Sequence, residues 1–216
     1  MALYNAVGLG YTARRREFAM NSFPSTLLAV AVLAGALGCS RPAKTNPKPF
    51  EAMSEVLARE ALKLVPGKGR VVVVAFDPGA DKMRREAWKM QWDSFQRAIK
   101  KPGATVTVTL DVLEAHGDDR FGPSVMLTAA QFFQLFAKHP QADVIVSFVG
   151  LPVFQAEDFA RVPEKTAKFV GFGAATGPAK RLLDEHVVDV IVTARTAQDW
   201  DKGNFEAVTA DAAPHQ

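Results

Sequence analysis

Polar residues stand directly after several apolar runs of the chain, where they could contact a ligand. Asp77 follows RVVVVAF at 70–76, Asp111 follows TVTVTL at 105–110, and Arg195 follows a third run that ends at Ala194. Carboxylate and guanidinium groups can hydrogen-bond a small polar solute. Ligands of open α/β sheets bind beyond the carboxyl ends of the strands, which is where these residues are expected to lie. The candidate contacts at such positions are Asp77, Asp111, Gly150, Gly173, Thr176 and Arg195.

These residues form no recognisable catalytic or cofactor-binding pattern. The glycine-rich stretch 171–177 lacks the glycine spacing of a dinucleotide fingerprint, and no serine lies in a Gly-x-Ser-x-Gly turn. The histidine nearest to carboxylates, His116, stands in a stretch typical of a solvated loop. We therefore expect no cofactor, no metal site and no catalytic residues. A small α/β enzyme of the cell envelope, using Asp77, Asp111 and Arg195, is the less favoured alternative.

The elements that must position these residues alternate between strand and helix. Apolar β-branched runs predict strands, and segments with helical apolar spacing or capping signals predict helices. Strands are expected at 70–76, 105–110, 142–148, 168–172 and 187–194, and helices at 50–65, 81–101, 128–138, 156–161 and 176–186. This order predicts an α/β fold that is doubly wound, with a mostly parallel five-stranded sheet in three α/β/α layers, forming a single lobe over 50–210.

Smaller signals refine this expectation. Thr128 and Gln131 have the spacing of a capping box at a helix start. Phe205 and Val208 could form a last short strand, and residues 211–216 are expected to be a disordered tail. Trp200 stands in a polar stretch, and we expect it to pack back on the sheet. The tryptophans at 88 and 92 are interpreted as core residues.

The N-terminal residues carry the features of an export signal. Residues 27–37, LLAVAVLAGAL, are apolar, follow three arginines at 14–16 and precede Cys39. The sequence around Cys39 resembles a bacterial lipobox, in which the cysteine is lipidated and becomes the new N-terminus. We expect a lipoprotein-type signal peptide at 1–38 and a proline-rich tether at 39–49. Ser40 weakly favours the outer membrane within the cell envelope. Both Sec and twin-arginine export, and a start at Met1 or Met20, stay open.

Charge and cysteine content exclude other classes of protein. The chain has 216 residues and a formal net charge of +3. Residues 1–38 hold three arginines and one glutamate, 3 − 1 = +2, which leaves 23 − 22 = +1 for the remainder. A nearly neutral domain is not expected to bind nucleic acid. The single cysteine excludes an intrachain disulfide.

Several stretches in order resemble type 1 periplasmic binding proteins, the sugar-binding family that shares its fold with the LacI regulators. The stretch KHPQADVIVSF at 138–148 is similar to the passage from a helix to a strand in that family, and KFVGF at 168–172 is similar to its Val-x-Gly-Phe-Asp strand. The resemblance covers about 68–196 and looks like the second of the family's two lobes. It implies a small polar solute, such as a sugar, contacted by Asp77, Phe148, Gly173 and Arg195.

The departures from that family are informative. Gly173 replaces the aspartate of the family's Gly-Phe-Asp strand, and Gly150 lies where the family often has Asn-Asp. The chain also has room for one lobe only. The main hypothesis is a membrane-tethered binding module for a solute. The alternative is a structural or interaction lipoprotein that forms a homodimer or binds a partner protein of the envelope.

Overall fold

The computed structural model describes residues 46–212, except 47, 66, 101–104, 114–126 and 163. These residues belong to one compact unit, Ala43–Gln216. The expected lipidation site Cys39, most of the tether and the last residues of the tail lie outside the described part. None of the described helices is both long enough and apolar enough to cross a membrane.

The described chain alternates between helices and strands, as expected. The helices are α1 Lys48–Leu64, α2 Lys82–Ile99, α3 Ala129–Lys138, α4 Ala156–Phe159, α5 Pro178–Asp184 and α6 Ala197–Lys202. The strands are β1 Lys68–Phe76, β2 Thr105–Leu113, β3 Leu127–Thr128, β4 Val144–Ser147, β5 Pro152–Val153, β6 Lys168–Phe172, β7 Val190–Thr193 and β8 Glu206–Val208. A short 3-10 helix, Ala210–Ala212, extends two residues past the predicted end of the domain at residue 210.

The main sheet has the order β2-β1-β4-β6-β7-β8, and its first five strands are parallel. The predicted doubly wound α/β fold is therefore confirmed. The sixth strand is β8, which pairs antiparallel with β7 and contains Val208 from the expected short strand. Strand β7 begins at Val190 and not at Val187. Val187 and Val188 lie in the connection before it and are fully buried. Apolar residues in a buried turn extend the hydrophobic run beyond the strand.

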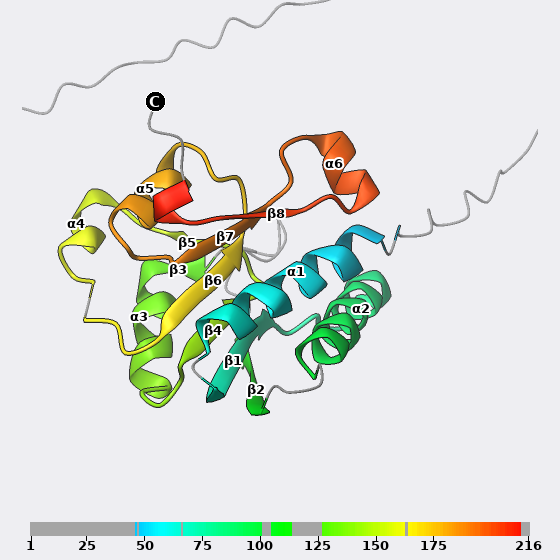
Figure 1. The fold of residues 1–216 in the computed structure, drawn as a ribbon, viewed down its shortest axis with the longest axis horizontal. Helices are drawn as coiled ribbons and strands as arrows, with labels where there is room; N and C mark the ends of the chain where they lie inside the picture. Colours follow the sequence, from blue (N-terminus) through cyan, green and yellow to red (C-terminus); the bar gives the residue numbers. More distant parts are fainter. Residues whose placement is uncertain are drawn as a thin grey trace, which may run out of the picture. The chain divides into compact units, whose positions relative to one another are not determined.

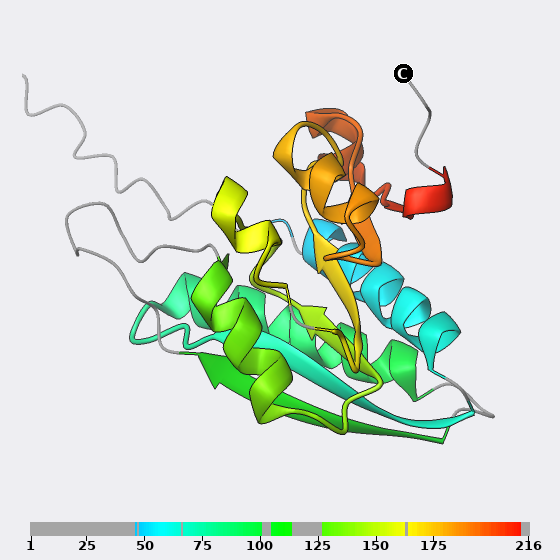
Figure 2. The same cartoon turned by 90° about the vertical axis from the view of Figure 1, so that its left-hand side faces the viewer.

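Helices cover both faces of this sheet (Figures 1 and 2). Helices α1 and α2 lie on one face and enclose a core that includes Met53, Leu57 and Phe95. Helices α3 and α5 lie on the other face, over a second core that includes Phe132 and Phe169. Both cores are made of residues that are almost fully buried.

Local signals fix the ends of the helices that lead to and from the sheet. The carboxylate of Asp81 accepts hydrogen bonds from two backbone amides at the start of α2. The predicted capping box of Thr128 and Gln131 starts α3 and is confirmed. Gly203 ends α6 with φ +74°, where an added Cβ would lie 2.9 Å from Cβ of Ala52 in α1. This close approach ties α6 to α1.

The order in which successive strands are added to the sheet reverses after β2. It passes from β1 to β2 at one edge and then returns to β4 on the other side of β1. The gap between the ends of β1 and β4 is thus the topological switch point, where doubly wound sheets bind their ligands. The carboxyl ends of the parallel strands lie along one side of the sheet. We call this side, which holds Asp77, Phe148, Gly173 and Ala194, the carboxyl edge.

Candidate functional site

A cavity of about 560 Å³ opens at the switch point, between the carboxyl ends of β1 and β4 and helices α1 and α2. We call it the first cavity. Its volume lies in the range of about 300–1,000 Å³ that is typical of small-molecule sites. Aromatic side chains supply much of its wall: Phe50, Phe76, Trp88, Phe148 and Phe172. The polar side chains that line it are Asp77, Asp81, Arg84 and Gln91.

The carboxylates at this cavity are held by backbone amides. Oδ1 of Asp77 accepts a hydrogen bond of 2.9 Å from the backbone N–H of Gly79. Oδ1 of Asp81 accepts from the backbone N–H of Met83 and of Arg84, at 2.8 and 3.1 Å. The hydrogen bond from Arg84 is the main cause that holds the pKa of Asp81 below its usual value. Both carboxylates are thus held in place by backbone amides next to the cavity that they line.

Helix α2 presents two polar groups that find no partner among the described residues. The buried Nε1 atom of Trp88 has no hydrogen-bond acceptor there. The side-chain amide of Gln91, a residue 9% exposed, also makes no hydrogen bond to the described residues. Trp88 and Gln91 lie three positions apart, on one face of the helix. Unpaired buried polar atoms are rare in folded proteins, and Nε1 of Trp88 is such an atom at the wall of this cavity.

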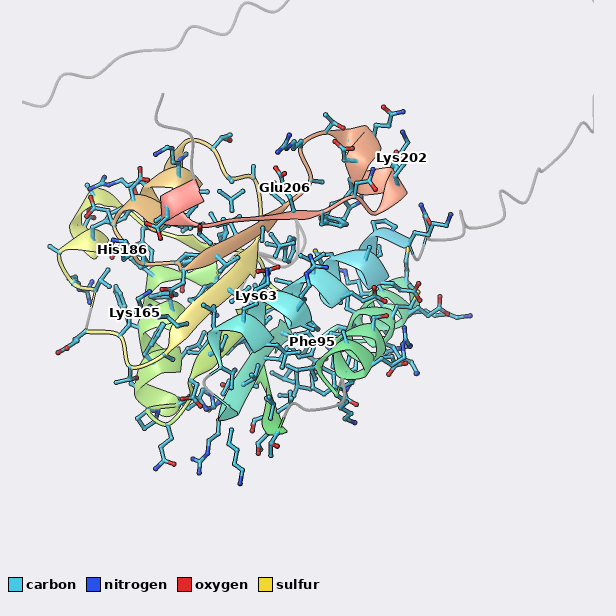
Figure 3. The ribbon with its side chains drawn as sticks, in the orientation of Figure 1. Lys63, Phe95, Lys165, His186, Lys202 and Glu206 are labelled. Carbon is cyan, nitrogen blue, oxygen red and sulfur yellow. The ribbon has the colours of Figure 1, made fainter. Side chains whose placement is uncertain are left out.

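The aromatic wall is anchored in the core beneath it. The ring of Phe148 is 5.4 Å from that of Phe95, at 78°, and Phe95 is fully buried. Figure 3 shows Phe95 on α2. The rings of Trp88 and Trp92 are stacked at 6.3 Å. These contacts hold the walls in one arrangement before a ligand arrives, which lowers the entropic cost of binding.

A second cavity, of about 390 Å³, lies beside the first at the carboxyl ends of β6 and β7. Its lining includes Gly173, Arg195, Trp200 and Phe205. Nε of Arg195 donates to Oε1 of Glu206 at 2.5 Å, and this hydrogen bond raises the pKa of Arg195. Figure 3 shows Glu206 on β8 at this end of the molecule.

The predicted contacts are divided between these cavities. Asp77 and Phe148 line the first cavity, whereas Gly173 and Arg195 line the second. Gly150 has φ +101°, and an added Cβ would lie 3.6 Å from the carbonyl oxygen of Phe172, a residue that lines both cavities.

Three predicted residues, Gly150, Thr176 and Asp111, line neither cavity. Thr176 is exposed in the turn before α5 and lines neither cavity. Asp111 does not follow β2, because that strand continues to Leu113. It is a buried residue that hydrogen-bonds Lys138 and His139 near the end of α3. The alternative enzyme site is therefore not formed, since Asp77, Asp111 and Arg195 do not line one cavity.

Sequence reasoning missed most of the walls of the first cavity. Phe50, Arg84 and Gln91 come from helices that the sequence places correctly, but their approach to the strand ends depends on tertiary packing. Trp88 was expected in the core, and it lies at the boundary between core and cavity. Trp200 does pack as expected, with its ring nearly perpendicular to those of Phe50 and Phe205.

Metal ligands do not gather in the part of the chain that the structure describes: it contains no group of three His, Cys, Asp or Glu residues able to hold an ion. The stretch around His116, which the sequence indicates to be a solvated loop, lies outside the described residues.

Comparison with known proteins identifies the fold. No protein-family model matches the sequence, and no curated protein is significantly similar to it. Among solved structures, the XylFII–LytSN complex matches with a TM-score of 0.51 and 8% identity over 76% of this chain and 61% of that one. AraP, an arabinose-binding protein from Geobacillus stearothermophilus, matches with a TM-score of 0.51 and 15% identity over 75% and 61% of the two chains.

A third neighbour is a Bacteroides fragilis protein assigned as a LacI transcriptional regulator. Its TM-score is 0.50, with 11% identity over 75% of this chain and 60% of that one. The chain therefore spans only about 60% of the length of these neighbours. At this level of identity the match concerns the fold alone, and that fold is the one predicted from the sequence, that of the type 1 periplasmic binding proteins.

Proposed function

We propose that this chain is an extracytoplasmic binding module, built on one lobe of the type 1 periplasmic binding protein fold, that recognises a small polar solute such as a sugar. The observation that carries this proposal is the first cavity. It lies at the switch point of the sheet and combines aromatic walls with a few hydrogen-bonding side chains. Both the position and the composition are those of a small-molecule site.

The chemistry of the lining fits a sugar. A pyranose has apolar C–H faces, which can pack on the rings of Trp88 and Phe148, and a rim of hydroxyl groups. Asp77 offers a carboxylate acceptor and Gln91 offers an amide donor and acceptor for those hydroxyls. The arabinose-binding protein among the structural neighbours supports the same class of solute.

We further propose that the module is tethered to the cell envelope by lipid on Cys39. The apolar run at 27–37 is followed by Gly38 and then by this cysteine, in the order of a lipoprotein signal. Two or three acyl chains suffice for stable anchoring, whereas a single chain gives marginal binding.

A panel of solutes tests the binding role. The melting temperature of the full chain is measured with pentoses, hexoses, amino acids and inorganic anions. A ligand at 100 times its dissociation constant stabilises a protein by about 2.7 kcal/mol, which is readily detected. Trp88→Ala should weaken a binding sugar about tenfold, because it removes an aromatic wall. The control is Lys89→Ala, at an exposed residue of the same helix that does not line the cavity. A melting temperature that no solute raises would overturn the proposal.

One observation favours a second role, in contact with another copy of the chain. The large apolar side chains that are exposed in the described structure are Met83, Val112 and Val153, at 56, 48 and 43%. Met83 lines the first cavity, Val112 lies near the end of β2, and β5 follows the end of β4. A homodimer joined at the carboxyl edge would cover them. Light scattering compares the molar mass of the wild type with that of the variants Met83→Lys and Val153→Lys. Only a dimer joined at the carboxyl edge would dissociate into monomers in these variants.

A further inference from the structure

The two cavities of the carboxyl edge share a wall. Phe172, the last residue of β6, lines both the first and the second cavity. A second bridge joins them, because Phe50 of the first cavity is 6.0 Å from Trp200 of the second, ring centre to ring centre. The cavities are therefore neighbours along one edge of the sheet, and not separate sites on different faces.

The second cavity, like the first, combines an aromatic wall with a charged side chain. Trp200 supplies an aromatic wall, held at steep angles by Phe50 and Phe205. Arg195 supplies hydrogen-bond donors: its Nε is taken by Glu206, and its two terminal nitrogens make no hydrogen bond to described residues. The guanidinium is thus oriented by one partner and retains free donors for another.

We propose that the solute of this site has two rings, as in a disaccharide, with one ring in each cavity. This inference rests on the proposed sugar-binding function and extends it. The first ring would lie between Trp88 and Phe148, and the second would pack near Trp200 within reach of Arg195. The bond that joins the two rings would pass Phe172. With volumes of about 560 and 390 Å³, each cavity has room for one ring of this size.

The structure favours one ligand with two rings over a single-ring solute. A monosaccharide in the first cavity would leave the aromatic and cationic groups of the second without a role. A ligand that spans both cavities buries both sets of groups in one binding event. The second ring then binds as an intramolecular step, which raises affinity without a second loss of translational freedom.

The test compares each monosaccharide with the disaccharides built from it. Calorimetric titration of the full chain uses glucose against maltose and cellobiose, and xylose against xylobiose. We expect one disaccharide to bind at least about tenfold more tightly than its monosaccharide, the gain from one further aromatic and polar contact set. Trp200→Ala should reduce that ratio to near one, whereas Trp200→Phe, which keeps a ring, should preserve most of it.

Two further variants guard against misfolding and general effects. Arg195→Gln removes the guanidinium and its charge, leaves only a shorter amide, does not touch the aromatic packing, and should also reduce the ratio. Lys202→Ala is the matched control, because Lys202 is an exposed residue of the same helix as Trp200 and lines neither cavity (Figure 3). It should leave the ratio unchanged. Each variant is first checked for a wild-type melting curve.

The outcomes separate this inference from the function beneath it. If a monosaccharide binds as tightly as its disaccharides, or if Trp200→Ala weakens both equally, the two-ring proposal is overturned while the sugar-binding role stands. If no sugar of either class binds, both proposals are overturned. A ratio that falls with Trp200→Ala and Arg195→Gln, and returns with Trp200→Phe, supports both.

Discussion

Nε2 of His139 lies 2.7 Å from Oδ2 of Asp111, and this carboxylate is only 6% exposed. Nζ of Lys138 lies 2.7 Å from the other oxygen of the same carboxylate. Asp111 thus joins the carboxyl-terminal part of an edge strand, β2, to the end of α3. A carboxylate that the sequence suggested as a ligand contact is therefore a structural link between two elements.

The first prediction concerns acid stability. Burial acts to raise the pKa of Asp111, but the hydrogen bonds from His139 and Lys138 outweigh it and the pKa is lowered. Its contribution to stability is therefore present above the unfolded-state pKa of about 3.9 and is lost as the pH falls through the lower folded-state pKa. Urea unfolding between pH 7 and pH 2 should show a shallower acid loss for Asp111→Asn. Asp93→Asn, at a carboxylate 44% exposed, is the control.

The second prediction concerns the partner of that carboxylate. His139→Ala should destabilise the protein by about 1–3 kcal/mol at neutral pH, because it removes a hydrogen bond from a buried acceptor. His186→Ala provides a comparison at an exposed histidine. Equal unfolding free energies for the two variants would show that the hydrogen bond between His139 and Asp111 does not stabilise the fold.

The third prediction concerns the junction of α6 with α1. Gly203→Ala combines a positive φ with a Cβ only 2.9 Å from Cβ of Ala52. Gly67→Ala has a similar φ of +64° but nothing within 4 Å. Overpacking of this kind costs about 1–3 kcal/mol, so Gly203→Ala should be less stable than Gly67→Ala by that amount. Thermal unfolding of both variants measures the difference, and identical melting temperatures would contradict the close approach.

The fourth prediction concerns the capping box of α3. Thr128→Ala should cost about 1 kcal/mol, because it removes the side chain that accepts from the Gln131 backbone N–H. Thr128→Ser, which retains the hydroxyl, should recover most of the loss. Denaturant midpoints for the two variants provide the measurement.

The fifth prediction concerns the proposed membrane anchor. Cells that express the full chain with a labelled fatty acid should incorporate the label into the wild type and into Ser40→Ala, but not into Cys39→Ser. If Cys39→Ser still incorporates the label, the lipid is attached to another residue. If the wild type incorporates none, the proposed lipid anchor is wrong.

The fold was predictable because its signals are local. The run Val71–Val74 is apolar at every position, which is typical of a strand covered on both faces, and the capping box marks the start of α3 in the sequence itself. The antiparallel strand β8 is short, and its sequence gives a weaker signal of the same kind.

The site was only partly predictable because its walls come from distant segments. Asp77 and Phe148 follow strands, so the fold alone brings them to one edge. Phe50 and Gln91 reach that edge through the packing of α1 and α2, which no local pattern encodes. Asp111 continues the polar alternation of Thr107 and Thr109 along β2, and its burial depends on side chains from α3.

The shared wall at Phe172 also has a thermodynamic consequence. A rotation of this one ring changes the shapes of both cavities at once, because it lines both of them. Two separate single-ring molecules would then not bind independently. If a molecule in the first cavity changes the affinity of the second cavity by some factor, a molecule in the second cavity changes the affinity of the first by the same factor, because such linkage is reciprocal. The carboxyl edge would behave as a pair of coupled sites joined through a single phenyl group.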